Sequence, residues 1–237
     1  MSEPAAPYPP APWRLRGWGA ATLHAVDVAA VRRILPAGVH IVHVWPGRTL
    51  GGLAFLSYER GSSLVYHELC VVAALVRIGR RFGFWLPRLD VDSDASLQGG
   101  HAIWSLPKRL AAFEIDETSD GTDVRIHDAA GLTCRMTIRD AAGGQSFRFP
   151  LMSLLPALAP CRGTAHFFTA GVVTQVRLAH LVVEAPRDGM IATLGLNRPS
   201  VLAFRLDELR LNVPAAHADV RFWGKTSTRV VSRHFAS

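Results

Sequence analysis

Lysine is scarce in this chain, and the two lysines it retains stand out. Of the 26 basic residues among 237, only Lys108 and Lys225 are lysines. An arginine guanidinium stays protonated at any working pH, so it cannot act as an amine nucleophile. A lysine kept in a chain that otherwise uses arginine for positive charge is therefore a candidate for amine chemistry. Lys225 has no evident role, whereas the sequence around Lys108 supplies a chemical context.

Lys108 follows a proline and lies among apolar residues. The segment 99–110 reads Gly-Gly-His-Ala-Ile-Trp-Ser-Leu-Pro-Lys-Arg-Leu. An amine placed beside Trp104 and Leu106 is desolvated, which disfavours its charged form. A neutral amine can add to a ketone and form an iminium, which allows a bond to a neighbouring carbon to break or form. From the residues alone, the alternative is that Lys108 and Arg109 form a solvated pair at a turn.

The run 104–110 resembles the aromatic-x-x-Pro-Lys-Lys-Leu motif of the acetoacetate decarboxylase family, in which the first lysine forms a Schiff base. Upstream, the run 65–68 (Val-Tyr-His-Glu) resembles the family segment that ends in an active-site glutamate. The run 89–92 (Leu-Asp-Val-Asp) lies where the family has an apolar strand ending in aspartate. The resemblance extends from about residue 12 to residue 215, and it is specific only between residues 65 and 110.

This resemblance implies that Lys108 forms the Schiff base and that Glu68 is its acid–base or orienting partner. Such a role favours a carboxyl group that can hold a proton. The alternative for Glu68 is an ordinary glutamate on the surface of a strand. The predicted substrate pocket adds Tyr66, which shares the face of Glu68 because strand side chains alternate, together with His101, Trp104, Leu106 and Arg109.

Two of these pocket predictions carry their own alternatives. For Tyr66 and His101, an ordinary packing role competes with a role in the pocket. Arg109 adds a second positive charge near the lysine, although strand alternation directs its side chain away from that of Lys108.

The chain departs from the family pattern at several polar positions. The early arginine of the decarboxylases aligns with Gly17 or Trp18, and their second glutamate aligns with Ala54. Their Arg-Glu pair after the glycines is replaced by His101 and Ala102, and their second lysine is an arginine here. These differences predict retained amine chemistry with a substrate other than acetoacetate.

Other groupings of polar residues predict neither a metal site nor a cofactor. His40 and His43 are three residues apart on a predicted strand, so they face opposite sides and cannot bind one ion. Asp90, Asp92 and Asp94 precede a predicted helix start, where capping accounts for at least one of them. The glycines between residues 79 and 83 lack the spacing of a dinucleotide or phosphate loop.

The elements that must position Lys108 are predicted to be mostly strands. We expect a β-rich α+β fold, with a mainly antiparallel sheet closing into a barrel or cone and a few short helices. Asp27 is expected to cap a helix that Pro36 ends, and Ser93 or Asp94 to cap another that runs to about His101. Strands are predicted at 39–45, 53–58, 64–78, 82–91, 111–115, 124–127, 132–138 and 172–185, with hairpin connections at 120–121 and 142–144.

The chain is predicted to form one domain over residues 13–237, preceded by an arm at 1–12 that contains five prolines. No apolar run approaches the roughly 20 residues of a membrane helix, and the arm itself has neither the basic nor the apolar region of an export signal. We therefore expect a cytoplasmic protein without a membrane partner. The family resemblance implies a homo-oligomer.

Functions from three classes compete. The first is a lyase that acts on a small keto acid or ketone through a Lys108 iminium, where decarboxylation, aldol, retro-aldol and dehydration reactions share the intermediate. The second is a non-catalytic β-barrel that binds a small molecule and does not need a neutral lysine. The third is nucleic-acid binding, which the net charge of +7 suggests. The arginines are scattered, however, and the dense cluster at 77–81 lies at a predicted turn, so no specific nucleic-acid partner is expected.

Overall fold

The computed structural model describes residues 7–141, 147–161 and 164–221, and over this part the chain is mostly β-strand. The predicted β-rich α+β class is therefore confirmed. The helices of the described part are α1 (Val28–Arg32), α2 (Asp94–Trp104) and α3 (Met190–Thr193). None of these three is long and apolar enough to cross a membrane. The predicted hairpin connection at 142–144 lies outside the described residues.

The strands form one hydrogen-bonded network. Its main path runs β2-β5-β6-β12-β13-β14-β1-β3-β4-β7-β8, and β15 and the β9–β10–β11 meander join it at β13. The strand pairs of the described part are antiparallel, apart from the parallel pairs β6–β12 and β7–β8. The bounds are β1 (Trp13–Asp27), β2 (His40–Ile41), β3 (Arg48–Tyr58), β4 (Tyr66–Val72), β5 (Ala74–Ile78), β6 (Arg81–Trp85), β7 (Arg88–Val91), β8 (Lys108–Leu110), β9 (Ala112–Thr118), β10 (Gly121–Asp128), β11 (Gly131–Asp140), β12 (Phe147–Cys161), β13 (Thr164–Glu184), β14 (Leu202–Val213) and β15 (His217–Arg221).

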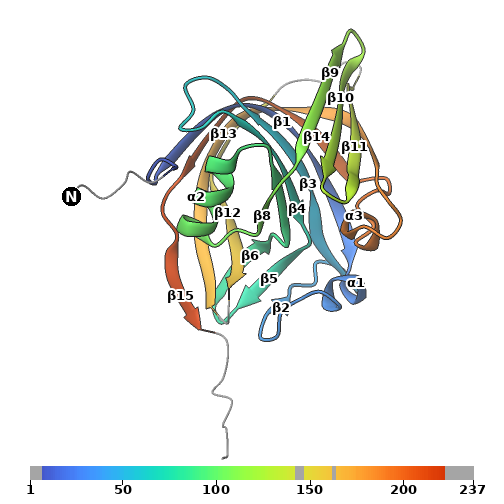
Figure 1. The fold of residues 1–237 in the computed structure, drawn as a ribbon. Coiled ribbons are helices and arrows are strands. Elements are labelled where there is room, and N and C mark those ends of the chain that lie inside the picture. Colours follow the sequence, from blue (N-terminus) through green and yellow to red (C-terminus); the bar gives the residue numbers. More distant parts are fainter. Residues whose placement is uncertain (1–6, 142–146, 162–163, 222–237) are drawn as a thin grey trace, which may run out of the picture.

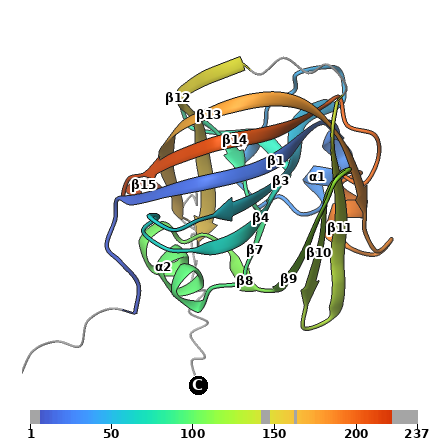
Figure 2. The same cartoon turned by 90° about the horizontal axis from the view of Figure 1, so that it is seen from above.

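The long strands curve around a common interior, with α2 beside β8 and with β9–β11 on the opposite side of the molecule (Figures 1 and 2). The path of paired strands is open over the described residues, because β2 and β8 end it and do not pair with each other. The predicted closure into a barrel is therefore not confirmed.

Helices α1 and α2 and the turn at 120–121 begin at the residues that the sequence predicts. Asp27 caps α1 by accepting a hydrogen bond from the Ala29 amide at 2.7 Å. Ser93 caps α2 by accepting from the Ser96 amide at 3.2 Å, and this helix continues to Trp104 instead of ending at His101. The predicted turn at 120–121 joins β9 to β10.

Several strands differ from their predicted extents. The predicted strand 64–78 forms β4 and β5, and 82–91 forms β6 and β7, with Pro87 in the second break because it lacks an amide donor. Strand β1 was not predicted, since its glycines and alanines have low β propensity. It forms because it pairs with β3 on one side and with β14 on the other.

Strands β3 and β4 separate two hydrophobic clusters. Phe55, Leu69 and Val71 pack into the cluster that β10, β11 and α3 also line. The alternate side chains, such as those of Tyr58 and Tyr66, face the second cluster, beside α2. Glu68 and Lys108, the predicted catalytic residues, lie on the side of the sheet that faces this second cluster.

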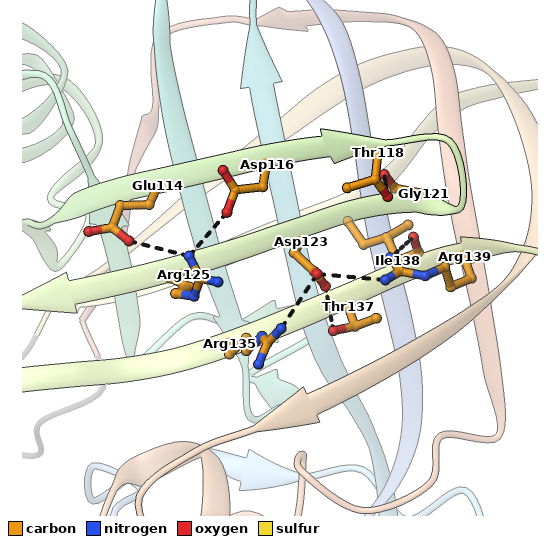
Figure 3. A network of polar contacts seen from close by, with 10 residues as sticks. All are labelled: Glu114, Asp116, Thr118, Gly121, Asp123, Arg125, Arg135, Thr137, Ile138 and Arg139. Atoms are coloured by element: carbon orange, nitrogen blue, oxygen red, sulfur yellow. Dashed lines mark hydrogen bonds and ion pairs between the residues drawn. The ribbon is translucent and has the colours of Figure 1, made fainter.

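The outward face of β9–β11 carries ion pairs instead of apolar side chains (Figure 3). Arg125 lies 3.1 Å from Asp116 and 3.6 Å from Glu114. Asp123 accepts a 2.6 Å hydrogen bond from Thr137 and pairs with two further arginines, Arg135 at 3.5 Å and Arg139 at 3.6 Å. This face is therefore a hydrated, charge-balanced surface.

Candidate active site

Strands β3 and β4 form one wall of the site through their antiparallel pairing. The register places Tyr58 opposite Tyr66 and Leu56 opposite Glu68. Because side chains alternate along a strand, all four point to the same side of the sheet. Glu68 is only 5% exposed, so the structure places it in the interior and not on a strand surface.

Lys108 begins β8, which lies in the same sheet as this wall and is separated from β4 by β7. After α2 the chain turns through Ser105, whose φ is 54°, and the Leu106 amide donates to the Gly100 carbonyl at 3.0 Å. Strand β8 then pairs in parallel with β7, with Lys108 opposite Leu89. Gly100 allows the lysine side chain to pass closely, because a Cβ atom at position 100 would lie 2.5 Å from Lys108 Cδ.

The Lys108 amine is buried among three polar contacts and aromatic rings. Its Nζ lies 2.7 Å from Glu68 Oε1, and it donates to Ser96 Oγ at 2.9 Å and to the Tyr66 hydroxyl at 3.5 Å. The same nitrogen lies 5.0 Å from the centre of the Tyr66 ring. Lys108 is 5% exposed, so the structure does not support a solvated Lys108–Arg109 pair.

The carboxylate of Glu68 is held from both sides. The Tyr58 hydroxyl donates to Glu68 Oε2 at 3.2 Å. The described residues donate no hydrogen bond to Oε1. The contact of Oε1 with Lys108 Nζ at 2.7 Å is therefore an ion pair. Burial, and next the negative charge of Glu68, raise the pKa of Tyr58 and of Tyr66 well above the usual value for tyrosine. Both phenols therefore keep their protons at neutral pH.

The amine faces a cavity with a volume of about 310 Å³. Among the predicted pocket residues, Tyr66, Trp104 and Leu106 line it together with Lys108 and Glu68. A carbonyl compound in this cavity would meet a lysine amine, a carboxyl group at 2.7 Å from that amine, and two phenols. Such a set of groups suits imine formation and proton transfer.

Two predicted pocket residues lie outside the cavity. Arg109 is exposed, because successive residues of β8 point to opposite faces and Lys108 takes the inner one. His101 is exposed on α2, and its Nε2 lies 2.9 Å from the backbone oxygen of Lys108. Its place in the structure is beside the lysine backbone and not beside the amine.

Three residues near the amine were not predicted from the sequence: Tyr58, Ser96 and Gly100. Tyr58 ends a predicted strand, so a predicted pairing of that strand with β4 would have brought it to Glu68. Ser96 lies three residues after the helix cap, and nothing in its sequence context predicted which group its hydroxyl contacts. Gly100 belongs to the segment 99–110, but nothing in that segment predicts that its missing side chain leaves space for the lysine.

The three alternating aspartates have separate partners. Asp90 is fully buried and accepts from Arg88 Nε at 2.8 and 2.9 Å. Asp92 lies 2.6 Å from His67 Nδ1, and Asp94 accepts from Gln98. No group of three His, Cys, Asp or Glu residues that could hold a metal ion occurs in the described part of the chain.

Solved structures share this fold. The acetoacetate decarboxylase of Legionella pneumophila matches with a TM-score of 0.67 at 15% identity, and the match covers 93% of each chain. The enduracididine biosynthesis enzyme MppR, in its complex with pyruvate, matches with a TM-score of 0.63 at 13% identity over 91% of this chain and 93% of that one. At these identities the likeness establishes the fold.

Sequence comparison places the chain in a family. The protein NEOXANTHIN-DEFICIENT 1 of Arabidopsis thaliana is 30% identical over 112 residues, and that of Solanum lycopersicum is 31% identical over 102 residues. These matches span 47% and 43% of this chain but only 39% and 34% of the plant proteins. Residues 2–180 match the family model of acetoacetate decarboxylase. Because that match covers most of the chain and the fold agrees with it, the protein belongs to the acetoacetate decarboxylase family.

Proposed function

We propose that the protein is a carbon–carbon lyase that forms an iminium between Lys108 and a keto acid or ketone. The observation that carries this proposal is the buried Lys108 amine, which lies 2.7 Å from Glu68 at the wall of a cavity. Membership of the acetoacetate decarboxylase family supports it. So does the pyruvate in the complex of the structural relative MppR.

Glu68 is the proton acceptor and donor in this proposal. Transfer of one proton from the Lys108 ammonium across the 2.7 Å contact yields a neutral amine and a neutral carboxylic acid. The amine adds to the carbonyl carbon, and the resulting carbinolamine carries a hydroxyl group. Protonation of that hydroxyl by Glu68 releases water, leaving a cationic iminium and an anionic carboxylate. The charges of the original ion pair are thereby restored.

The iminium then accepts an electron pair from a neighbouring carbon. In a decarboxylation the departing group is carbon dioxide, and in a retro-aldol step it is an aldehyde or ketone. Each cleavage leaves an enamine, which is protonated on carbon and hydrolysed to free the lysine. Tyr66 and Ser96 lie within 3.5 Å of Nζ and can hold the carbinolamine hydroxyl or the departing water.

Borohydride trapping tests the proposal directly. The protein is incubated with pyruvate, acetoacetate or a longer keto acid, reduced with borohydride, digested and examined by peptide mass. We expect a reduced adduct on the peptide that contains Lys108 and none in Lys108→Ala. Labelling of Lys225 alone, or no labelling with any carbonyl compound, would overturn the lyase proposal.

A non-catalytic binding protein of the same fold is the second candidate. It is favoured by the Lys108–Glu68 contact itself, because an ammonium held in an ion pair is not a nucleophile. Such a protein would bind an apolar fluorescent probe in the cavity, and probe binding would survive while borohydride left the lysine unmodified. A reduced adduct on Lys108 would exclude this candidate.

A further inference from the structure

The cavity around Lys108 has few polar groups free to bind a substrate. Among the described residues that line it, Lys108 is the only cation and Glu68 the only anion, and these two pair with each other. Thr22 Oγ1 accepts from the Leu53 amide at 3.0 Å. The rest of the lining is dominated by aliphatic and aromatic side chains from β1, β3, β4, β13 and β14.

The indole donors of the lining are also occupied. Trp13 Nε1 donates to the Pro9 carbonyl at 2.8 Å, and Trp104 Nε1 donates to the Pro214 carbonyl at 2.7 Å. The Tyr58 hydroxyl donates to Glu68. A second anionic group in the cavity would therefore find neither a free cation nor a free indole N–H among these residues, and burying an unpaired carboxylate is costly.

The charges of the reaction lead to the same conclusion. After iminium formation the site holds one positive charge on the Lys108 nitrogen and one negative charge on Glu68, as it did before. An uncharged ketone or aldehyde preserves this balance through the whole cycle. A keto acid would add a second negative charge beside Glu68, and the described residues that line the cavity offer it no counter-charge.

The shape of the wall indicates where an apolar chain would lie. Beyond Glu68, the same face of β4 presents Cys70 and Val72, and the paired face of β3 presents Ala54 and Gly52. The four residue-to-residue steps from Glu68 to Val72 correspond to about 13 Å of wall. Leu206 and Leu211 of β14 contribute to the same cavity, whose volume of about 310 Å³ lies near the lower end for small-molecule sites.

We propose, on the basis of the iminium function above, that the substrate is an uncharged ketone or aldehyde whose apolar chain lies along the Glu68–Val72 wall. Its carbonyl carbon bonds to Lys108 Nζ with loss of water. The Glu68 carboxylate then removes a proton from the carbon next to the iminium, and the C–H electron pair forms the enamine double bond. Returning a proton to that carbon restores the iminium. A carbon–carbon bond can form or break at the same carbon, and no carboxylate is lost.

A matched pair of probes tests this substrate class. 2-Nonanone and 2-oxononanoate have the same heptyl chain and differ by a methyl in place of a carboxylate, and acetone and pyruvate are the short counterparts. We expect 2-nonanone to label Lys108 under borohydride at a concentration at least tenfold lower than 2-oxononanoate or acetone. In deuterium oxide, 2-nonanone should exchange its α-protons, and Lys108→Ala should abolish this exchange.

The outcomes separate this inference from the proposed function. If either keto acid labels Lys108 at the same or a lower concentration than 2-nonanone, the iminium function stands and the uncharged substrate class is wrong. If neither these four compounds nor acetoacetate labels Lys108, the iminium function fails, and the inference fails with it.

A substitution in the Glu68–Val72 wall tests where the apolar chain lies. Ala54→Leu fills the space opposite Cys70, so the preference for 2-nonanone over acetone should fall at least tenfold. Ala112→Leu makes the same change at an exposed position of β9, outside the cavity, and should retain the preference. An unchanged preference in Ala54→Leu would contradict the proposed position of the chain, and labelling by acetone reports whether this variant folds.

Discussion

Lys108 and Glu68 are a buried ion pair, to which the proposed function assigns a chemical role. Taking two charges out of water costs free energy that their attraction offsets only in part, and such pairs are often no more stabilising than apolar side chains of similar size. The pair here gains Tyr58 as a donor to the carboxylate, and Ser96 as an acceptor from the amine. Those contacts hold the two groups at a distance over which a proton can transfer.

Glu68→Gln tests the role of the carboxyl group. The amide is nearly the same size but cannot exchange a proton with the amine, so we expect the rate of Lys108 labelling to fall by about 100-fold or more. Glu59→Gln, at an exposed position just after β3, is the matched control and should label at the rate of the unchanged protein. A rapid reaction in Glu68→Gln would mean that another group moves the proton.

The buried tyrosines predict a loss of stability at alkaline pH. Burial, followed by the charge of Glu68, raises the pKa of Tyr58 and Tyr66, so the folded protein keeps protons that the unfolded chain releases above about pH 10. The free energy of unfolding should therefore fall as pH rises beyond that value. Tyr58→Phe should make the fall less steep between pH 8 and pH 11 in urea titrations. Equal slopes for both proteins would contradict this assignment.

At the scale of elements, α2 and the turn after it determine where the lysine lies. Ser96 and Gly100 lie on the face of α2 that contacts the Lys108 side chain, and the αL conformation of Ser105 directs the chain into β8. Strand β8 pairs in parallel with β7, and β7 pairs with β4. The position of the amine therefore depends on β4, β7 and α2 together.

Gly100→Ala is expected to separate stability from chemistry. Alanine favours a helix over glycine by about 1 kcal/mol, but its Cβ would lie 2.5 Å from Lys108 Cδ. The flexible lysine side chain must shift, so labelling should fall at least tenfold while the melting temperature changes little. Ala102→Gly, at an exposed position of the same helix, should lower the melting temperature and leave labelling intact. Wild-type labelling in Gly100→Ala would show that the close approach is unimportant.

Asp92 connects β4 to the end of β7, just before α2. It accepts from the His67 amide at 2.7 Å and lies 2.6 Å from His67 Nδ1. Burial alone would raise the pKa of Asp92, but these hydrogen bonds lower it overall. Its stabilising contribution is therefore present above about pH 4 and is lost as pH falls through the lowered folded-state pKa.

Asp92→Asn should accordingly destabilise the protein by about 1 to 2 kcal/mol at pH 7. The difference from the unchanged protein should shrink as pH falls from 5 to 3, as measured by urea denaturation. A difference that does not depend on pH would assign the effect to packing and not to the charge.

At the scale of the whole molecule, the positive charge is dispersed. Several arginines of the described part pair with acidic residues, including Arg88 with Asp90 and Asp128, and Arg177 with Asp140 and Asp207. On β9–β11, arginines pair with carboxylates on the neighbouring strand, so their charges are neutralised locally (Figure 3). Such exposed pairs contribute little to stability, typically below about 1 kcal/mol each.

This distribution predicts weak and non-specific binding to nucleic acid. The net charge of +7 should give detectable binding to double-stranded DNA at low salt, followed by a steep loss between about 50 and 200 mM salt. Fluorescence anisotropy measures both, and Lys108→Ala should not change either. Sequence-specific binding that persists at 200 mM salt would contradict this prediction and support a function in nucleic-acid binding.

Features that depend on local chemistry can be predicted from the sequence. The scarcity of lysine and the motif around Lys108 pointed to the amine, and the capping residues Asp27 and Ser93 placed the starts of α1 and α2. Strand alternation alone placed Tyr66 on the face of Glu68 and directed Arg109 away from Lys108. These features depend on residues within a few positions of each other, so a single segment carries them.

Contacts between residues far apart in the chain depend on the way the strands pair. Tyr58 contacts Glu68 because β3 pairs with β4 in one register, and a shift of one residue would turn its side chain to the other face. Strand β1 exists because β3 and β14 flank it, against the low propensity of its own residues. The apolar lining of the cavity combines strands from the two ends of the chain. Register and long-range pairing arise from the combined burial of many segments, and no local pattern encodes them.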